Sequence, residues 1–349
     1  MLGSETWARW TGLSIFTGAL LIAPALAETA RDQLEAQPGA TLAAAVAQAP
    51  ASASVMAAKN PSDLTQDYLS AFEDDGELGG TDIRRLRAFK VLLVPGFLSN
   101  RYPVYFDDQL AWLKSVRIEA EYVKLNSEAE PETNAKTIGA RVRASEKPVL
   151  ILSHSKGSLD VWTAMVAEPD LASGPNGVKG WISLQGAFLG SPVADFIVDH
   201  SLTGPELGSR LWELIGGTRQ SLLSLTTKSA MDRFSRGKDA SKSLAEAVPI
   251  IAFASRGPSR SPGLSHKVLS QFGEWMLPIA SDGLVPVDRA WLPGMSYIDA
   301  TGIDHADPVM RDALATPGSE DFDRIRMTKA LFSLLLRRMP PANSEKRTP

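Results

Sequence analysis

The chain contains no cysteine among its 349 residues. Disulfide bonds, thiolate nucleophiles, cysteine-ligated zinc and thiolate-bound iron–sulfur clusters are therefore excluded. Histidine is also scarce, so a histidine-rich metal centre is not expected, although sites built from carboxylates alone remain open. Neither sign of charge dominates, because the formal net charge is −4. No basic stripe with interleaved aromatic residues is present, which argues against a nucleic-acid partner.

Apolar residues, in contrast, are plentiful enough for a large core. The chain is 44% hydrophobic and 22% charged, which is typical of a globular protein. Without its terminal segments about 280 residues remain, which suits one large α/β domain with an insertion, or two smaller domains.

The first 27 residues have the pattern of a secretory signal peptide. Arg9 precedes an apolar run over residues 13–26, and residues 25–27 have the small-x-small pattern of a cleavage site. The apolar run is shorter than the ~20 residues of a comfortable membrane span. An uncleaved N-terminal anchor is the alternative. Both interpretations place the domain outside the cytoplasm, in a secreted or periplasmic protein.

Residues 28–60 are rich in Ala, Gln, Ser and Pro and have few large apolar side chains. Such a composition cannot bury much surface, so we expect a low-complexity linker. The folded domain is expected over residues 61–340, followed by a short tail at 341–349.

Within that domain, buried apolar runs alternate with segments of helical periodicity. Strands are predicted at 91–94, 118–125, 149–153, 178–184, 249–253 and 295–298, and helices near 64–72, 110–116, 133–144, 156–165 and 322–336. Continuous apolar strands that alternate with helices predict an α/β fold, with a mostly parallel central sheet and helices on both faces.

Residues 191–247 interrupt this alternation, because they show helical apolar spacing without a strand. An insertion above the carboxyl ends of the strands is where a lid over an active site would lie. We therefore predict a helical lid, with ordinary covering helices as the alternative.

The most informative motif is Ser153-His154-Ser155-Lys156-Gly157, between a buried strand and a helix. A small-x-Ser-x-Gly sequence at such a junction forces its central residue into a strained turn, with the side chain standing clear above the sheet. Ser155 is therefore a candidate nucleophile, although a serine in this position can also be a plain helix N-cap. Ser153 stands where glycine is usual, but serine is still small enough for the turn.

A serine hydroxyl needs a base, and the base needs an orienting acid. His305 lies in a polar loop between a short strand and the last helix, which is a suitable place for the base. His200 and His266 are expected to be solvated surface side chains. His154 should point away from Ser155 and pack inside the turn.

Asp282 is the candidate acid, in an Asp-Gly turn that precedes His305 by 23 residues. Asp288 and Asp304 are its rivals. Asp304 is the immediate neighbour of His305, and adjacent loop side chains usually diverge.

The tetrahedral intermediate of acyl transfer needs backbone N–H donors. Lys156, at the start of the helix after Ser155, should supply one. Phe97 should supply the second from the loop after the first core strand, where Gly96 allows a close approach. We expect the Lys156 side chain to be exposed and solvated.

With these motifs the chain resembles the bacterial secreted triacylglycerol lipases and esterases of the α/β-hydrolase superfamily. The similar segments follow in the family's order: 94–97 (oxyanion loop), 153–157 (nucleophile turn), 190–196 and 224–230 (lid), 281–285 (acid loop) and 304–307 (histidine loop). The resemblance implies an α/β-hydrolase fold with a helical lid and a Ser155–Asp282–His305 triad.

It further implies a serine hydrolase that cleaves carboxylic esters through an acyl-enzyme. The expected substrate is a small-molecule or lipid ester, and transient contact with a lipid interface is expected. Two alternatives stay open. An acyltransferase or polyester depolymerase could use the same fold, or the chain could be a catalytically silent binding protein.

Many of these lipases hold a structural calcium ion near the histidine loop. Asp307 matches one of its ligands, but Arg311 stands where the family has a glutamine, and no partner aspartate occurs before Asp282. We therefore expect no cofactor, and a calcium ion stays open only as an alternative that these departures disfavour.

Overall fold

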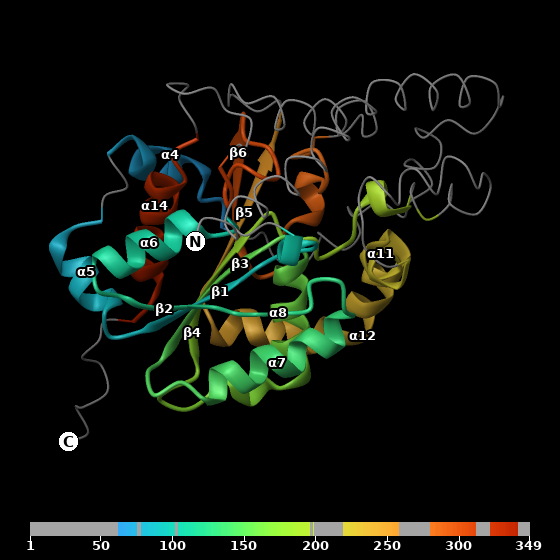
Figure 1. The fold of residues 1–349 in the computed structure, drawn as a ribbon, viewed down its shortest axis with the longest axis horizontal. Coiled ribbons are helices and arrows are strands. Elements are labelled where there is room, and N and C mark those ends of the chain that lie inside the picture. The colour runs from blue at the N-terminus through green and yellow to red at the C-terminus, as the bar shows by residue number, and fades with distance from the viewer. Residues whose placement is uncertain are drawn as a thin grey trace, which may run out of the picture.

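A parallel six-stranded sheet in the order β2-β1-β3-β4-β5-β6 forms the centre of the molecule (Figure 1). The computed structural model describes residues 62–74, 78–101, 104–195, 198, 219–257, 280–311 and 322–340. The expected signal peptide, linker and C-terminal tail lie outside the described residues, as do His200 and His266.

The strands occupy the apolar runs that predict them. They are β1 (Lys90–Val94), β2 (Glu119–Tyr122), β3 (Val149–His154), β4 (Val178–Leu184), β5 (Ile250–Arg256) and β6 (Ser296–Thr301). The predicted α/β class with a parallel sheet is confirmed, with small shifts at the strand ends.

The helices are α4 (Thr65–Glu73), α5 (Gly80–Leu86), α6 (Asp107–Ser115), α7 (Pro131–Arg143), α8 (Lys156–Ala167), α11 (Arg219–Leu225), α12 (Thr227–Ala247) and α14 (Arg324–Arg338). Short 3-10 turns are η1 (Ser99–Arg101), η2 (Pro169–Ala172) and η3 (Val287–Arg289). Helix α5 is not predicted by the sequence, because it begins in a glycine-rich stretch. Asp82 caps its N-terminus by accepting the Gly79 N–H at 3.3 Å, and Leu86 near its end is buried.

Each face of the sheet has its own core, because neighbouring residues of a strand point to opposite sides. In β1, Leu92 and Val94 pack with residues of α7, α8 and α12. Val91 and Leu93 pack on the other face with residues of α4, α6 and α14. Figure 1 shows these two groups of helices on opposite sides of the strands. The strands are therefore apolar on both faces.

The described part of the 191–247 insertion includes α11 and α12. Helix α12 packs on α8, where the Phe234 and Trp162 rings lie 6.3 Å apart and Trp162 Nε1 donates to Ser241 Oγ at 3.0 Å. Helix α12 thus covers one face of the sheet. Residues 199–218 lie outside the described residues, so the lid stays a prediction.

The free edge of β6 is covered by the beginning of the described chain. Tyr297 N donates to Ser62 O at 3.0 Å, and Leu64 N donates to Tyr297 O at 2.8 Å. Asp299 N donates to Thr65 Oγ1 at 3.0 Å. An uncovered edge strand would offer its backbone groups to another chain, so this short segment protects the sheet.

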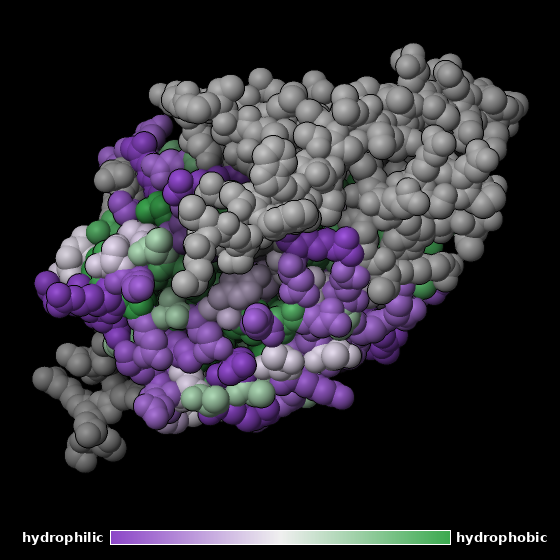
Figure 2. All heavy atoms as spheres, viewed as in Figure 1, coloured by the Kyte–Doolittle hydropathy of each residue, from purple (hydrophilic) through white to green (hydrophobic). Residues whose placement is uncertain are grey.

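The described surface is mostly hydrophilic, as Figure 2 shows for one face. Within the described residues, the exposed large hydrophobic side chains are Leu69 and Val104. In the same part of the chain, no helix combines the length and the apolar character that a membrane span requires.

Replacement of a buried leucine on α14 tests how much the core on this face of the sheet contributes to stability. Leu331 on α14 is fully buried, and Leu331→Ala should lower the free energy of unfolding by about 2–5 kcal/mol through lost burial and a residual cavity. The matched control is Leu69→Ala, because Leu69 on α4 is 41% exposed and its loss should scarcely change stability. Urea unfolding gives the free energy of unfolding of both variants. Equal losses would contradict the assignment of Leu331 to a core beneath α14.

Candidate active site

The candidate residues lie in loops that follow strands β1, β3, β5 and β6 of the sheet. Gly96 and Phe97 follow β1, Ser155 follows β3, and His305 follows β6. Asp282 lies between β5 and β6, in a turn tied to the end of β5 by the Gly257 N–H, which donates to Ser281 O at 2.8 Å. Since the strands are parallel, these loops meet at one edge of the sheet, where ligands of open α/β sheets usually bind.

Ser155 sits in a strained turn between β3 and α8. Its φ is 54° and its ψ is −129°, a combination that a residue with a side chain rarely adopts and that costs on the order of 1–3 kcal/mol. The turn is tight because a Cβ at Gly157 would lie 2.3 Å from the carbonyl oxygen of Pro95. The predicted strand–turn–helix geometry around Ser155 is therefore present.

Ser153, at the position where glycine is usual, has a specific partner. Trp181 Nε1 donates to Ser153 Oγ at 2.7 Å, and Ser153 Oγ lies 2.8 Å from Ser158 Oγ. All three side chains are buried. The serine thus supplies an acceptor that the buried indole N–H of β4 needs.

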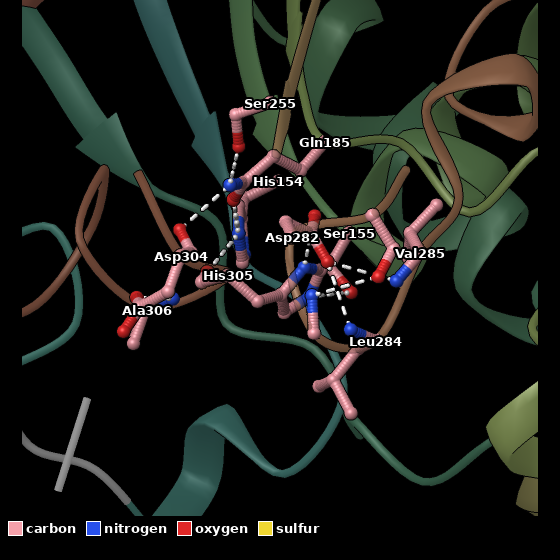
Figure 3. Close-up of polar contacts among 12 residues, drawn as sticks. His154, Ser155, Gln185, Ser255, Asp282, Leu284, Val285, Asp304, His305 and Ala306 are labelled. Atoms are coloured by element: carbon pink, nitrogen blue, oxygen red, sulfur yellow. Dashed lines mark hydrogen bonds and ion pairs between the residues drawn. The ribbon is translucent and has the colours of Figure 1, made fainter. Parts of the chain in front are cut away.

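A chain of two hydrogen bonds joins the three residues predicted to act together (Figure 3). His305 Nε2 lies 2.8 Å from Ser155 Oγ, and His305 Nδ1 lies 2.8 Å from Asp282 Oδ2. A carboxylate only accepts hydrogen bonds, so Nδ1 carries the ring proton and Nε2 is free to accept the serine hydroxyl. The histidine is therefore oriented to remove a proton from Ser155.

Backbone groups hold Asp282 in place. Its Oδ1 accepts the N–H groups of Leu284 and Val285 at 2.9 and 2.8 Å, and its own carbonyl accepts the His305 N–H at 2.9 Å. The carboxyl group is 1% exposed, so these bonds replace water.

The two other candidate acids, Asp304 and Asp288, do not contact the His305 ring in the contacts of the described residues. Asp304 Oδ1 accepts the N–H groups of Ala306 and Asp307 at 2.8 and 2.9 Å, so it closes the turn that follows it. Asp288 is exposed in η3. Of the three acids, the structure brings Asp282 to the His305 ring.

The loop after β1 approaches Ser155 closely, as Gly96 predicts. A Cβ at Gly96 would lie 2.9 Å from the Ser155 Cβ and 2.7 Å from the Tyr105 hydroxyl. Phe97 follows this glycine, and Lys156 is the first residue of α8, where a backbone N–H has no acceptor within the helix. Lys156 thus adjoins Ser155 in sequence, and Phe97 adjoins the glycine that approaches Ser155 in space.

A cleft opens beside this loop. It has a volume of about 770 Å³, and its lining includes Ser99, Tyr105, Tyr122, Lys124 and Asn126. The lining combines polar groups with the apolar surfaces of the aromatic rings, a mixture that is common in small-molecule sites.

The expectation that the Lys156 side chain is solvated was wrong. The side chain is fully buried, and Nζ donates to both carboxylate oxygens of Asp160, at 2.9 and 3.0 Å. Asn134 Nδ2 donates to the same carboxylate at 2.8 Å. Burial raises the pKa of Asp160, and Lys156 opposes that rise. An acid one turn along the helix was the missed signal, because i and i+4 side chains face each other.

His154 is buried inside the turn, as expected, but its polar contacts were not predicted. Its ring contacts Gln185 and the backbone of His305 (Figure 3). It also contacts the Tyr105 hydroxyl. Gln185 follows the apolar strand β4 directly and has φ +47°, another strained position at the carboxyl edge of the sheet. A glutamine immediately after a buried strand was a signal that the sequence already held.

The surroundings of Asp307 do not fit a calcium ion. Asp307 Oδ2 accepts the Asp304 N–H at 2.9 Å, and Arg324 Nε donates to the Asp307 carbonyl at 3.1 Å. Arg311 pairs with Asp108. Calcium needs several oxygen ligands, whereas two cationic side chains lie in this region. The absence of a cofactor stays a prediction.

Comparison with known proteins identifies the fold. No family model matches the chain, and no curated protein matches it. The metagenomic carboxyl esterase MGS0156 is similar in structure, with a TM-score of 0.56 and 20% identity over 72% of this chain and 77% of that chain. The chain has an α/β-hydrolase fold.

The propeptide form of the Bacillus licheniformis lipase BlEst2 is also similar in structure. Its TM-score is 0.51 and its identity 18%, and the match covers 74% of this chain but only 52% of that chain. At such low sequence identity, the similarity to these two structures shows a shared fold and nothing further.

The buried ion pair below Ser155 should be essential for stability. Asp160→Asn would leave the Lys156 ammonium group buried without its counter-charge, and we expect a loss of about 3–5 kcal/mol in the free energy of unfolding. The matched control is Asp232→Asn, which breaks an exposed i,i+4 pair with Lys228 and should leave the unfolding midpoint unchanged. Equal midpoints for the two variants would contradict this role of Asp160.

Ser153→Gly should restore the usual motif and yet destabilise the protein. The variant leaves the Trp181 indole N–H without its acceptor, which should cost about 1–3 kcal/mol. In a Trp181→Phe background the same change should cost clearly less, because the orphaned donor is gone. Chemical denaturation of the four proteins gives this coupling energy. Additive effects would show that the hydrogen bond has no stabilising role.

Proposed function

We propose that this protein is a serine hydrolase that cleaves carboxylic esters through an acyl-enzyme. The observation that carries the proposal is the pair of 2.8 Å hydrogen bonds that joins Ser155, His305 and Asp282 at the carboxyl edge of the sheet. In this proposal Ser155 is the nucleophile, His305 the general base and acid, and Asp282 the residue that orients the imidazole.

In the first step the Ser155 oxygen attacks the carbonyl carbon of the ester while its proton passes to His305 Nε2. The carbonyl oxygen becomes an oxyanion, and the backbone N–H groups of Phe97 and Lys156 are its proposed donors. Asp282 stabilises the imidazolium that forms, because its carboxylate is already bonded to Nδ1.

In the second step His305 donates the proton to the leaving alcohol, and the C–O bond of the ester breaks. The acyl group remains on Ser155. Water then loses a proton to His305 Nε2 and attacks the acyl carbon, and collapse of the second tetrahedral intermediate returns the proton to Ser155. The products are one carboxylic acid and one alcohol.

We assign the cleft that Tyr105 helps to line to one side of the ester, because Tyr105 accepts the N–H of Gly96, the residue before Phe97. The proposed substrate is a small-molecule or lipid ester. The names of the two similar structures, a carboxyl esterase and a lipase, support this class of substrate. A secreted or periplasmic location and transient contact with a lipid interface belong to the same proposal and rest on the sequence.

Ser155→Ala should abolish ester cleavage. We expect kcat for p-nitrophenyl esters to fall by about 10⁴-fold or more, because removal of a member of such a triad leaves only residual catalysis. Ser173→Ala, at an exposed serine in the loop before β4, is the control and should retain wild-type turnover. A series of acyl chain lengths on the wild-type protein also defines the preferred substrate. Turnover by Ser155→Ala within tenfold of the wild type would refute the proposal.

A fluorophosphonate probe separates a hydrolase from a catalytically silent binding protein. The probe should label the wild type at Ser155 and fail to label Ser155→Ala, because labelling needs an activated hydroxyl. Analysis of the products in the presence of added alcohols then separates hydrolysis from acyl transfer. A folded wild-type protein that does not react with the probe would favour the binding protein.

A further inference from the structure

A second, fully buried hydrogen-bond chain crosses the site behind Ser155. It begins at Gly96, whose N–H donates to the Tyr105 hydroxyl at 3.0 Å. Tyr105 contacts His154 Nδ1 through a short hydrogen bond. His154 Nε2 lies 2.9 Å from the carbonyl oxygen of His305. The chain therefore connects the loop before Phe97 with the backbone of the residue that contacts Ser155.

The direction of each hydrogen bond follows from its partners. Gln185 Nε2 lies 2.7 Å from the Asp304 carbonyl, which only accepts, so the Gln185 amide must present Oε1 to His154 at 2.9 Å (Figure 3). His154 Nε2 thus faces two acceptors and must carry the ring proton. Its Nδ1 is then the acceptor of the Tyr105 hydroxyl.

The imidazole of His154 stays neutral in this setting. Burial, and then the neighbouring His305, hold the pKa of His154 well below its ordinary value of 6.5. The two imidazole rings lie 4.6 Å apart, so a second positive charge at His154 would oppose an imidazolium at His305. A neutral ring can donate at one nitrogen and accept at the other, which is what this chain requires.

We propose that Tyr105 and His154 are positioning residues that hold the loop of Gly96 and Phe97 in register with His305. Neither touches the reacting atoms, and each acts through a backbone group of a loop that does. The inference rests on the proposed function, because it concerns the same reaction.

Such positioning is needed because two separate loops must place their groups accurately around the Ser155 side chain. The transition state needs the base on one side of Ser155 and the N–H donors on the other, and a misplacement of about 1 Å can cost 10²-fold in rate. Residues 96 and 305 are far apart in sequence, so local turns cannot fix their relative position. The buried chain through Tyr105 and His154 supplies that restraint.

The test uses three variants of the full chain. Tyr105→Phe keeps the ring but removes the hydroxyl that joins Gly96 to His154. His154→Gln can keep an amide N–H near the place of Nε2, whereas His154→Asn reaches only the place of Nδ1. Ser241→Ala is the matched control, since it also removes a buried hydroxyl that accepts an N–H, from Trp162, away from the site.

We expect kcat for p-nitrophenyl esters to fall about 10- to 100-fold in Tyr105→Phe and His154→Asn, with KM within about twofold of the wild type. His154→Gln should recover most of the loss, and Ser241→Ala should retain wild-type kcat. Wild-type kcat in both Tyr105→Phe and His154→Asn, or an equal loss in Ser241→Ala, would overturn the proposal.

Nuclear magnetic resonance of protein labelled with ¹⁵N-histidine gives a readout that does not need activity. The ring signals of His305 should shift in Tyr105→Phe and His154→Asn and stay unchanged in Ser241→Ala. If the wild type cleaves no ester, the proposed function fails, while these signals still report the restraint on His305. Unmoved His305 signals in both variants would show that the chain does not position this residue.

Discussion

At Gly157 the backbone after β3 touches the backbone after β1, with no room for a side chain between them. A Cβ there would lie 2.3 Å from Pro95 O and 2.6 Å from Val94 O. At Gly96 the same two loops meet again, beside the Ser155 Cβ. Because the two loops are in close contact at both glycines, the backbone conformation of Ser155 is tightly restricted. The other residues of the site pack around this turn.

Polar groups under this contact are buried and paired rather than exposed. Lys156 and Asp160 form an ion pair below the turn, and Ser153 accepts a hydrogen bond from the Trp181 indole beside it. A buried pair or network of this kind is costly when one member is missing, but it favours a single arrangement when complete. The rigidity around Ser155 therefore comes from polar contacts as well as from the apolar core, which helps to maintain the left-handed φ of this residue.

Much of this arrangement could be predicted from the sequence, and the remainder has a common physical cause. Continuous apolar runs such as Val149–Leu152 predict strands buried on both faces. The order Ser155, Asp282, His305 singles out the residues that the fold brings together. The burial of Lys156 was missed because a charged side chain is assigned to solvent unless its partner is recognised. Tyr105 and Gln185 were missed because their partners lie in loops far away in the sequence.

The strand that leads to His305 has a neighbour from the start of the domain. Residues 62–65 hydrogen-bond along the outer side of β6, at Tyr297 and Asp299, a few positions before the histidine loop. This segment completes the sheet in the manner of a short seventh partner. A chain shortened past Thr65 would expose the β6 edge to pairing between molecules and would also release the strand that leads into the His305 loop. Self-association and loss of the site would then both result from the loss of the segment that covers β6.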